Sequence, residues 1–259
     1  MCKNVTIMVK SLIKENMPYT EDGNIVHFIP DDESRPDWSK ALDGYFTGNN
    51  VDLQMKQVYE EQRKLMTNDR NHRRLIDLVS SVKGVKVDLA SGPSGYFAPF
   101  LDTLTESDIF IATDACPSVI KAHSSACDKD NFYVFDIDLD KELPFKDEAV
   151  DIFTGNLLNN VNSYAELLRE VHRCLKPGGK LAVIELFFEH GCKTYEHLNS
   201  QGSIWASFET YVSYCESVGF ALIGSDIIGT RKGKIAQGDL YPLDDNDCST
   251  DRIIYFEKK

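Results

Sequence analysis

A turn of small side chains, with two acidic residues behind it, is the feature of this sequence best suited to bind a ligand. Residues 88–95 read Asp-Leu-Ala-Ser-Gly-Pro-Ser-Gly, and such a turn lets a ligand approach main-chain N–H groups without meeting a Cβ atom. Asp114 lies 26 positions after Asp88, where a carboxylate can accept two hydrogen bonds from a ribose diol. Asp136 can accept from an exocyclic amine while Ile137 packs on a flat ring.

Each of these features alone also fits a structural role. The turn fits a strand-to-helix loop that needs glycine for packing, Asp114 fits a residue near a helix start, and Asp136 fits one of several surface acids. It is their order along the chain that indicates a site for a nucleoside, so the elements around them decide the interpretation.

Segments typical of strands and helices alternate around these residues. The predicted strands are 85–90, 109–113, 132–135, 150–154 and 180–186, and the predicted helices are 96–104, 117–126, 163–175 and 208–218. Strands joined through helices need right-handed crossovers, so the predicted fold class is α/β, a doubly wound, mostly parallel sheet with helices on both faces. Segments 220–228 and 252–257 are predicted as closing antiparallel strands. A ligand then belongs at the carboxyl ends of the strands, where the strand order reverses.

The first 50 residues differ in character from the rest. They contain three prolines and an acidic run at 31–33, which predict an irregular or partly helical cover and not a separate domain. From Val51 onward apolar residues recur at helical spacing. The predicted organisation is an N-terminal cover over 1–50 and a ligand-binding domain over 51–259.

The composition limits the partners. With 41 acidic and 28 basic residues among 259, the net charge is −13, and long-range repulsion argues against a nucleic-acid backbone or an anionic membrane surface. No segment approaches the roughly 20 apolar residues that cross a bilayer. The seven cysteines contain no C-x-x-C pair, and no His, Asp or Cys group has metal-ligand spacing. We therefore expect a soluble cytoplasmic protein with no nucleic-acid partner, no membrane partner and no metal; the sequence does not indicate an oligomeric state.

Several motifs follow one another in a set order. They are the turn at 88–95, Asp114, Asp136 with Leu143-Pro144-Phe145, Val150-Asp151-Ile152-Phe153, and 168–180, which reads Leu-Arg-Glu-Val-His-Arg-Cys-Leu-Lys-Pro-Gly-Gly-Lys. Together they resemble the class I S-adenosylmethionine-dependent methyltransferases, in the small-molecule branch. The resemblance covers about residues 85–190 and continues toward 259 through Val218-Gly219-Phe220. It implies a Rossmann-like methyltransferase fold, with S-adenosylmethionine as the cofactor and a small-molecule substrate.

The resemblance implies a role for each residue that matches a family motif. The loop under the methionine part of the cofactor would consist of Asp88, Ala90, Gly92, Ser94 and Gly95. Asp114 would hold the ribose hydroxyls with Ala115 beside the adenine, Asp136 and Ile137 would address the adenine edge, and Gly155 and Asn156 would lie near the transferable methyl. The family usually has glycine where this chain has Ala90.

Candidates on the substrate side follow from position. Tyr45, Phe46 and Tyr59 lie where the cover would close over a pocket, and aromatic faces there suit a cationic or flat substrate. Asn159 follows the fourth strand, where the family often has a histidine; Glu185 lies near the end of the fifth strand, and His190 follows it. Ordinary packing for the aromatic residues and a solvated loop position for His190 remain the more frequent roles of such residues.

The chemistry implied by the resemblance needs no dedicated catalytic residue, because the methyl group of a sulfonium is already activated. The protein must hold the nucleophile (nitrogen, oxygen or sulfur) in line with the methyl–sulfur bond and exclude water. Two alternatives remain. One is a cofactor-binding partner subunit that has lost catalysis, which Ala90 leaves open. The other is an NAD-dependent oxidoreductase, although the run from Gly92 does not form G-x-G-x-x-G.

Overall fold

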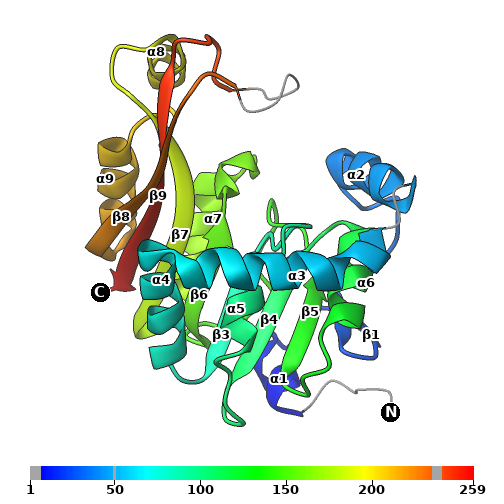
Figure 1. The fold of residues 1–259 in the computed structure, drawn as a ribbon. Helices are drawn as coiled ribbons and strands as arrows, with labels where there is room; N and C mark the ends of the chain where they lie inside the picture. Colours follow the sequence, from blue (N-terminus) through cyan, green and yellow to red (C-terminus); the bar gives the residue numbers. More distant parts are fainter. Residues whose placement is uncertain (1–6, 49–50, 235–240) are drawn as a thin grey trace.

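The computed structural model describes residues 7–48, 51–234 and 241–259, and the strands of these segments form one nine-stranded sheet in the order β1-β2-β5-β4-β3-β6-β7-β9-β8 (Figure 1). The strands are β1 Thr20–Asp22, β2 Ile25–His27, β3 Val85–Leu89, β4 Ile109–Asp114, β5 Phe132–Asp136, β6 Val150–Asn156, β7 Leu175–Phe188, β8 Phe220–Lys232 and β9 Cys248–Lys258. Strands β5, β4, β3, β6 and β7 are parallel neighbours, and β9 and β8 close the sheet in antiparallel orientation. The predicted doubly wound, mostly parallel sheet is confirmed.

The order of the sheet reverses beside β3. The chain runs from β3 to β4 and β5 on one side, then returns to lay β6 against the other side of β3, with Leu89 opposite Gly155 at the ends of the two strands. The connections that leave β3 and β6 therefore diverge, and they open a space at the carboxyl ends of the strands.

Helices cover both faces of the sheet. They are α1 Ile7–Leu12, α2 Asp37–Gly48, α3 Val51–Asn68, α4 Arg70–Ser81, α5 Ala98–Leu101, α6 Pro117–Ala126, α7 Tyr164–Cys174, α8 Lys193–Ser200 and α9 Phe208–Val218, with a short 3-10 helix η1 Leu158–Asn160. Helices α3 to α6 pack their apolar residues on one face, and α1, α7 and α9 pack theirs on the other. Figure 1 shows α3 lying across the strands on the first of these faces.

Local signals explain where several helices begin and end. Pro117 opens α6 at a position where its missing N–H has no partner in any case. Gly219 ends α9 with φ +113°, a conformation that favours glycine. Helix α5 is shorter than the predicted 96–104, because the chain around it forms turns.

The N-terminal segment contributes more than a cover. Residues Ile25–His27 form β2, which pairs in parallel with β5, and β1 pairs with β2 at the edge of the sheet. Helix α2 stands outside the sheet (Figure 1) and packs Phe46 on Cys116 and Val119. Three-residue strands have no periodicity to detect, so the sequence did not predict them. Within the described ranges, no helix is long and apolar enough to cross a membrane.

Candidate active site

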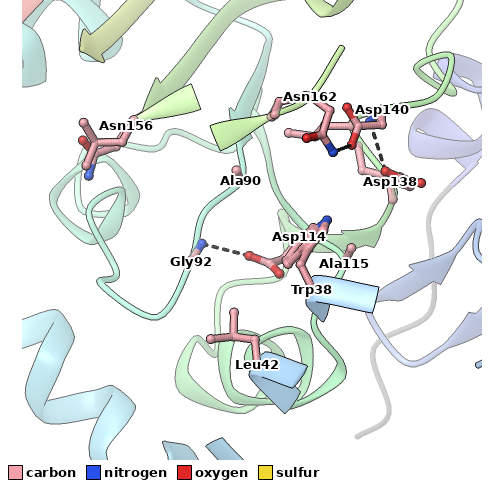
Figure 2. A pocket seen from close by; sticks show the side chains of 14 residues that line it. Trp38, Leu42, Ala90, Gly92, Asp114, Ala115, Asp138, Asp140, Asn156 and Asn162 are labelled. Carbon is pink, nitrogen blue, oxygen red and sulfur yellow. Dashed lines mark hydrogen bonds between the residues drawn. The ribbon is translucent and has the colours of Figure 1, made fainter. Parts of the chain in front are cut away.

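A cavity of about 540 Å³ lies at the carboxyl ends of the strands on either side of the reversal (Figure 2). Its size falls within the roughly 300–1,000 Å³ usual for sites that bind small molecules and cofactors. The lining residues are Trp38, Leu42, Ala90, Gly92, Asp114, Ala115, Ile137, Asp138, Leu139, Asp140, Asn156, Leu157, Val161 and Asn162. The predicted cofactor residues that reach the cavity are therefore Ala90, Gly92, Asp114, Ala115, Ile137 and Asn156.

The glycine-rich loop after β3 is held by the neighbouring strand β4. The N–H of Ser91 donates to the carbonyl of Thr113 at 2.8 Å, and the N–H of Ala90 donates to the Thr113 hydroxyl at 3.3 Å. Ala90 has φ +47°, a left-handed conformation that costs a residue with a Cβ about 1 kcal/mol or more. A Cβ built on Gly92 would meet only the Ala90 carbonyl, at 3.7 Å, so a side chain there would extend into open space.

Asp114 ends β4 and faces this loop. One carboxylate oxygen accepts from the Gly92 N–H at 3.0 Å and the other from the Cys116 N–H at 2.8 Å. Burial raises the pKa of Asp114 to about 6, although these N–H donors favour the charged form, and the nearby Asp136 raises it further. Each carboxylate oxygen keeps a second lone pair, so Asp114 can still accept hydrogen bonds from a ligand in the cavity.

Asp88 supports the loop from behind and does not line the cavity. It is buried at the end of β3 and accepts a hydrogen bond from the Thr154 hydroxyl at 2.5 Å. Burial raises its pKa to about 6, and the charge of Asp114 adds to the increase. Ser94 and Gly95 also lie outside the lining: Gly95 packs against the ring of Tyr59.

Asp136 lies in a different place from the one the sequence suggests. It is fully buried, and its carboxylate accepts from both terminal nitrogens of Arg35, at 2.8 and 2.6 Å, and lies 2.8 Å from Nδ1 of His27. Asp136 does not line the cavity, and its carboxylate is buried against these partners. Asp138, two residues later, does line it.

The N-terminal segment forms one wall of the cavity. Trp38 and Leu42, one helical turn apart on α2, line it, and Trp38 keeps 48% of its surface exposed. The carbonyl of Ala115 anchors this segment, because it accepts from the Ser39 hydroxyl at 2.5 Å and from Arg35 at 2.8 Å. The wall is therefore bonded to the end of the strand that carries Asp114.

The loop after β6 forms the opposite wall. Leu157, Val161 and Asn162 line the cavity, and Leu157 has φ +55°. Asp140 joins this loop to the loop after β5, because its carboxylate accepts from the Asn162 side chain at 2.9 Å and from the Ser163 N–H at 2.6 Å. Figure 2 shows Asp140 between Asp138 and Asn162.

The aromatic substrate-side candidates do not line the cavity. Tyr45 is 64% exposed on α2, beside Phe46. Tyr59 is buried on the far side of the glycine loop, because its ring packs on Phe97 and its hydroxyl lies 2.8 Å from Nδ1 of His123. The helical spacing that predicted α3 does not show which of its aromatic residues face the interior.

The remaining substrate-side candidates occupy the region beyond the cavity. Glu185 is fully buried in β7, where it accepts from the Tyr164 hydroxyl at 2.8 Å and the Leu158 N–H at 3.1 Å. Burial raises its pKa to about 8, while the backbone of Asn159 opposes the increase through a hydrogen bond. His190 is largely exposed and lies 3.5 Å from Glu209. Glu185 therefore supports η1 and the loop wall without reaching the cavity itself.

Two signals in the sequence could have revealed more of the site. Trp38 is a large aromatic residue between polar neighbours, and Asp138 and Asp140 follow the third predicted strand at alternate positions. The contribution of Leu157, Val161 and Asn162 depends on the path of a loop, which residue types alone do not determine.

A doubly wound sheet with this strand order, and a cavity between a glycine-rich loop and an acidic strand end, defines a class I methyltransferase fold. Residues 87–183 match the family described as "Methyltransferase domain". A putative methyltransferase of Bacillus halodurans superposes with a TM-score of 0.54 at 15% identity, covering 72% of this chain and 97% of that one. Geranyl diphosphate C-methyltransferase of Streptomyces coelicolor, solved with S-adenosyl-L-homocysteine, superposes with a TM-score of 0.52 at 12% identity, covering 72% and 78%.

A curated relative matches over a shorter stretch. Demethylmenaquinone methyltransferase of Listeria welshimeri is 53% identical over 45 residues, which cover 17% of this chain. The match spans only 19% of the length of that relative. Residues 87–183 therefore match a methyltransferase domain, and the superpositions show that the chain has the fold of these proteins.

Proposed function

We propose that the whole chain transfers a methyl group from S-adenosylmethionine to a small-molecule acceptor, mainly by holding the acceptor in line with the methyl–sulfur bond. The observation that carries this proposal is the cavity at the strand reversal, which is lined by Ala90 and Gly92 of the glycine-rich loop and by Asp114. The cofactor supplies an activated methyl group, so the protein has to bind, orient and exclude water.

The residues of the cavity fit the cofactor. Open space over Gly92 leaves room for the methionine part, and Asp114 has lone pairs free for the ribose hydroxyls. Ala115 and Ile137 offer apolar contacts for the adenine ring. We assign the adenine edge to Asp138 in place of Asp136, because Asp138 lines the cavity while Arg35 and His27 occupy Asp136.

No side chain of the described lining is a histidine, lysine, arginine or tyrosine. This supports catalysis by proximity, with Asn156 near the methyl group and the walls of α2 and the loop after β6 enclosing the acceptor. Three lining residues, Asp114, Asp138 and Asp140, are acidic. A phosphate or carboxylate on the acceptor would meet their repulsion with no lining cation to offset it, so we propose a neutral or cationic acceptor.

A two-stage experiment tests the function. Calorimetry should show that S-adenosylmethionine and S-adenosylhomocysteine bind, and that NAD does not; binding of NAD alone would favour the oxidoreductase and refute the proposal. Labelled methyl transfer to a panel of small amines, phenols and thiols, with carboxylated and phosphorylated analogues as matched controls, should then favour the uncharged and cationic members. Preference for the anionic analogues would contradict the proposed acceptor class, and cofactor binding without any transfer would favour the partner-subunit alternative.

We also propose a cytoplasmic location and treat residues 1–50 and 51–259 as parts of one folding unit. The buried free thiols of Cys116, Cys127, Cys174 and Cys215 support a reducing compartment. The pairing of β2 with β5 supports a single unit, since it joins the N-terminal segment to the central sheet.

A further inference from the structure

A buried histidine lies behind the glycine-rich loop, outside the cavity. His123 on α6 is fully buried, and its Nε2 lies 2.9 Å from the carbonyl oxygen of Gly92. Its Nδ1 lies 2.8 Å from the hydroxyl oxygen of Tyr59 on α3. These two contacts connect both helices to the loop that borders the cavity, although neither side chain lines the cavity itself.

The partners determine where the protons lie. A carbonyl oxygen only accepts, so Nε2 of His123 must carry the proton that it donates to Gly92. Burial lowers the pKa of His123 to about 4, so the ring is neutral near pH 7 and its Nδ1 is an acceptor. Burial also raises the pKa of Tyr59, which therefore keeps its proton and donates it to Nδ1. Both ring nitrogens are satisfied in this one arrangement.

The pair supports the loop at two points. The N–H of Gly92 donates to Asp114 at 3.0 Å while its carbonyl accepts from His123, so the peptide groups on both sides of Gly92 are held in place. At Gly95, a Cβ would lie 2.6 Å from the Tyr59 ring, which shows that this ring fills the space behind the loop. Phe97 packs edge-on against both rings, with centroids 5.5 Å from Tyr59 and 4.9 Å from His123.

We propose that Tyr59 and His123 are positioning residues: their hydrogen bonds hold the glycine-rich loop in the conformation that binds the cofactor, and so they increase cofactor affinity without contacting it. The inference rests on the proposed function, in which the cofactor lies against this loop. The conformation of the loop matters for binding in two ways. It places the Gly92 N–H against Asp114, and it leaves open space for the cofactor above Gly92.

Calorimetry with S-adenosylhomocysteine tests the proposal on the full chain. His123→Leu removes the donor to Gly92 and should weaken binding about tenfold, and Tyr59→Phe, which keeps the ring, should weaken it about threefold. His123→Gln places an amide donor near the position of Nε2 and should recover most of the loss. Ser124→Ala is the matched control: on the same helix it removes a hydroxyl that donates to Asn24 at 2.5 Å, so affinity should stay within twofold of the wild type.

Nitrogen-15 spectra of histidine-labelled wild type supply a second readout. They should show His123 protonated on Nε2, with no titration between about pH 5.5 and pH 8. A ring protonated on Nδ1, or one that titrates in this range, would overturn the proposal. So would wild-type affinity in both His123→Leu and Tyr59→Phe; if His123→Leu does not fold, Tyr59→Phe decides alone. A wild type that binds no cofactor analogue would instead refute the proposed function, and this inference with it.

Discussion

Replacing Asp114 by asparagine should separate cofactor affinity from stability. In the wild type the two carboxylate oxygens accept from Gly92 and Cys116 and have lone pairs free for a ribose diol. Asparagine keeps one acceptor oxygen and no charge. Losing charged hydrogen bonds to the ligand should cost about 2 kcal/mol, which is roughly a thirtyfold loss of affinity. Calorimetry with S-adenosylhomocysteine, which is not consumed, measures this directly.

The free energy of unfolding should change far less than the affinity. Because burial raises the pKa of Asp114 from 3.8 to about 6, the charged form is disfavoured in the fold by roughly 3 kcal/mol at pH 7, and asparagine relieves this cost. The N–H group left without an acceptor costs roughly 1–3 kcal/mol in the opposite direction. The two effects nearly cancel, so the midpoint of thermal unfolding should move by only a few degrees.

Asp108 at the opposite end of β4 provides a matched control. It is also buried, and its oxygens accept from the N–H groups of Gly84 at 3.0 Å and Thr105 at 2.9 Å. Burial opposes its ionisation, but these donors outweigh it and hold the pKa of Asp108 below its usual value. Asp108→Asn should therefore lower stability and leave affinity unchanged. If folded Asp114→Asn binds S-adenosylhomocysteine as tightly as the wild type, the assignment of Asp114 to the ribose is refuted.

Three further predictions concern other parts of the site. Gly95→Ala places a Cβ at φ +60° within 2.6 Å of the buried Tyr59 ring, so it should lower the free energy of unfolding in denaturant titrations by about 2–4 kcal/mol. Gly178→Ala is the control, because Gly178 has φ +75° but open space around it, and it should cost only about 1 kcal/mol. Equal losses in the two variants would mean that the protein relieves the close contact at Gly95. Burial raises the pKa of Glu185 from 4.5 to about 8 in the folded protein, so the stability that its protonated form provides is lost as the pH rises from about 4.5 to about 8. Glu185→Gln should therefore reduce the pH dependence of the melting temperature over this range. An unchanged profile would contradict this prediction. The fluorescence change on cofactor binding should disappear in Trp38→Phe, because Trp205 lies outside the cavity; a change that persists would place the signal, and the ligand, elsewhere.

Local signals in the sequence were enough to predict the central sheet. The strand predicted at 109–113 is observed as Ile109–Asp114, and the helix predicted at 117–126 is observed as Pro117–Ala126. A run of β-branched residues and a proline at the first helical position each act within one element. The reversal of strand order then followed from the alternation of strands and helices, which is why the place of the cavity could be predicted.

Long-range partners could not be predicted in the same way. Asp136 is paired with Arg35 and lies 2.8 Å from Nδ1 of His27. Both partners come more than a hundred positions earlier, in the segment that joins the sheet where β2 pairs with β5. The roles assigned to Asp88, Ser94 and Asn159 remain predictions, since their residue types fit both support and contact. The spacing of apolar residues in α3 predicts a helix, but it does not show whether a tyrosine faces a ligand or, like Tyr59, packs behind a loop.

The two walls of the cavity have different origins. The rim that carries Asp114 belongs to the central sheet, whereas Trp38 and Leu42 belong to helix α2, which stands outside the sheet. This helix is bonded to the carbonyl of Ala115 through Ser39 and to Ser118 on α6 through Asp43. Substitutions in this helix leave the hydrogen bonds between strands intact. On the proposed function, acceptor preference can therefore diverge through substitutions in this helix, while the residues proposed to hold the cofactor stay under separate constraint.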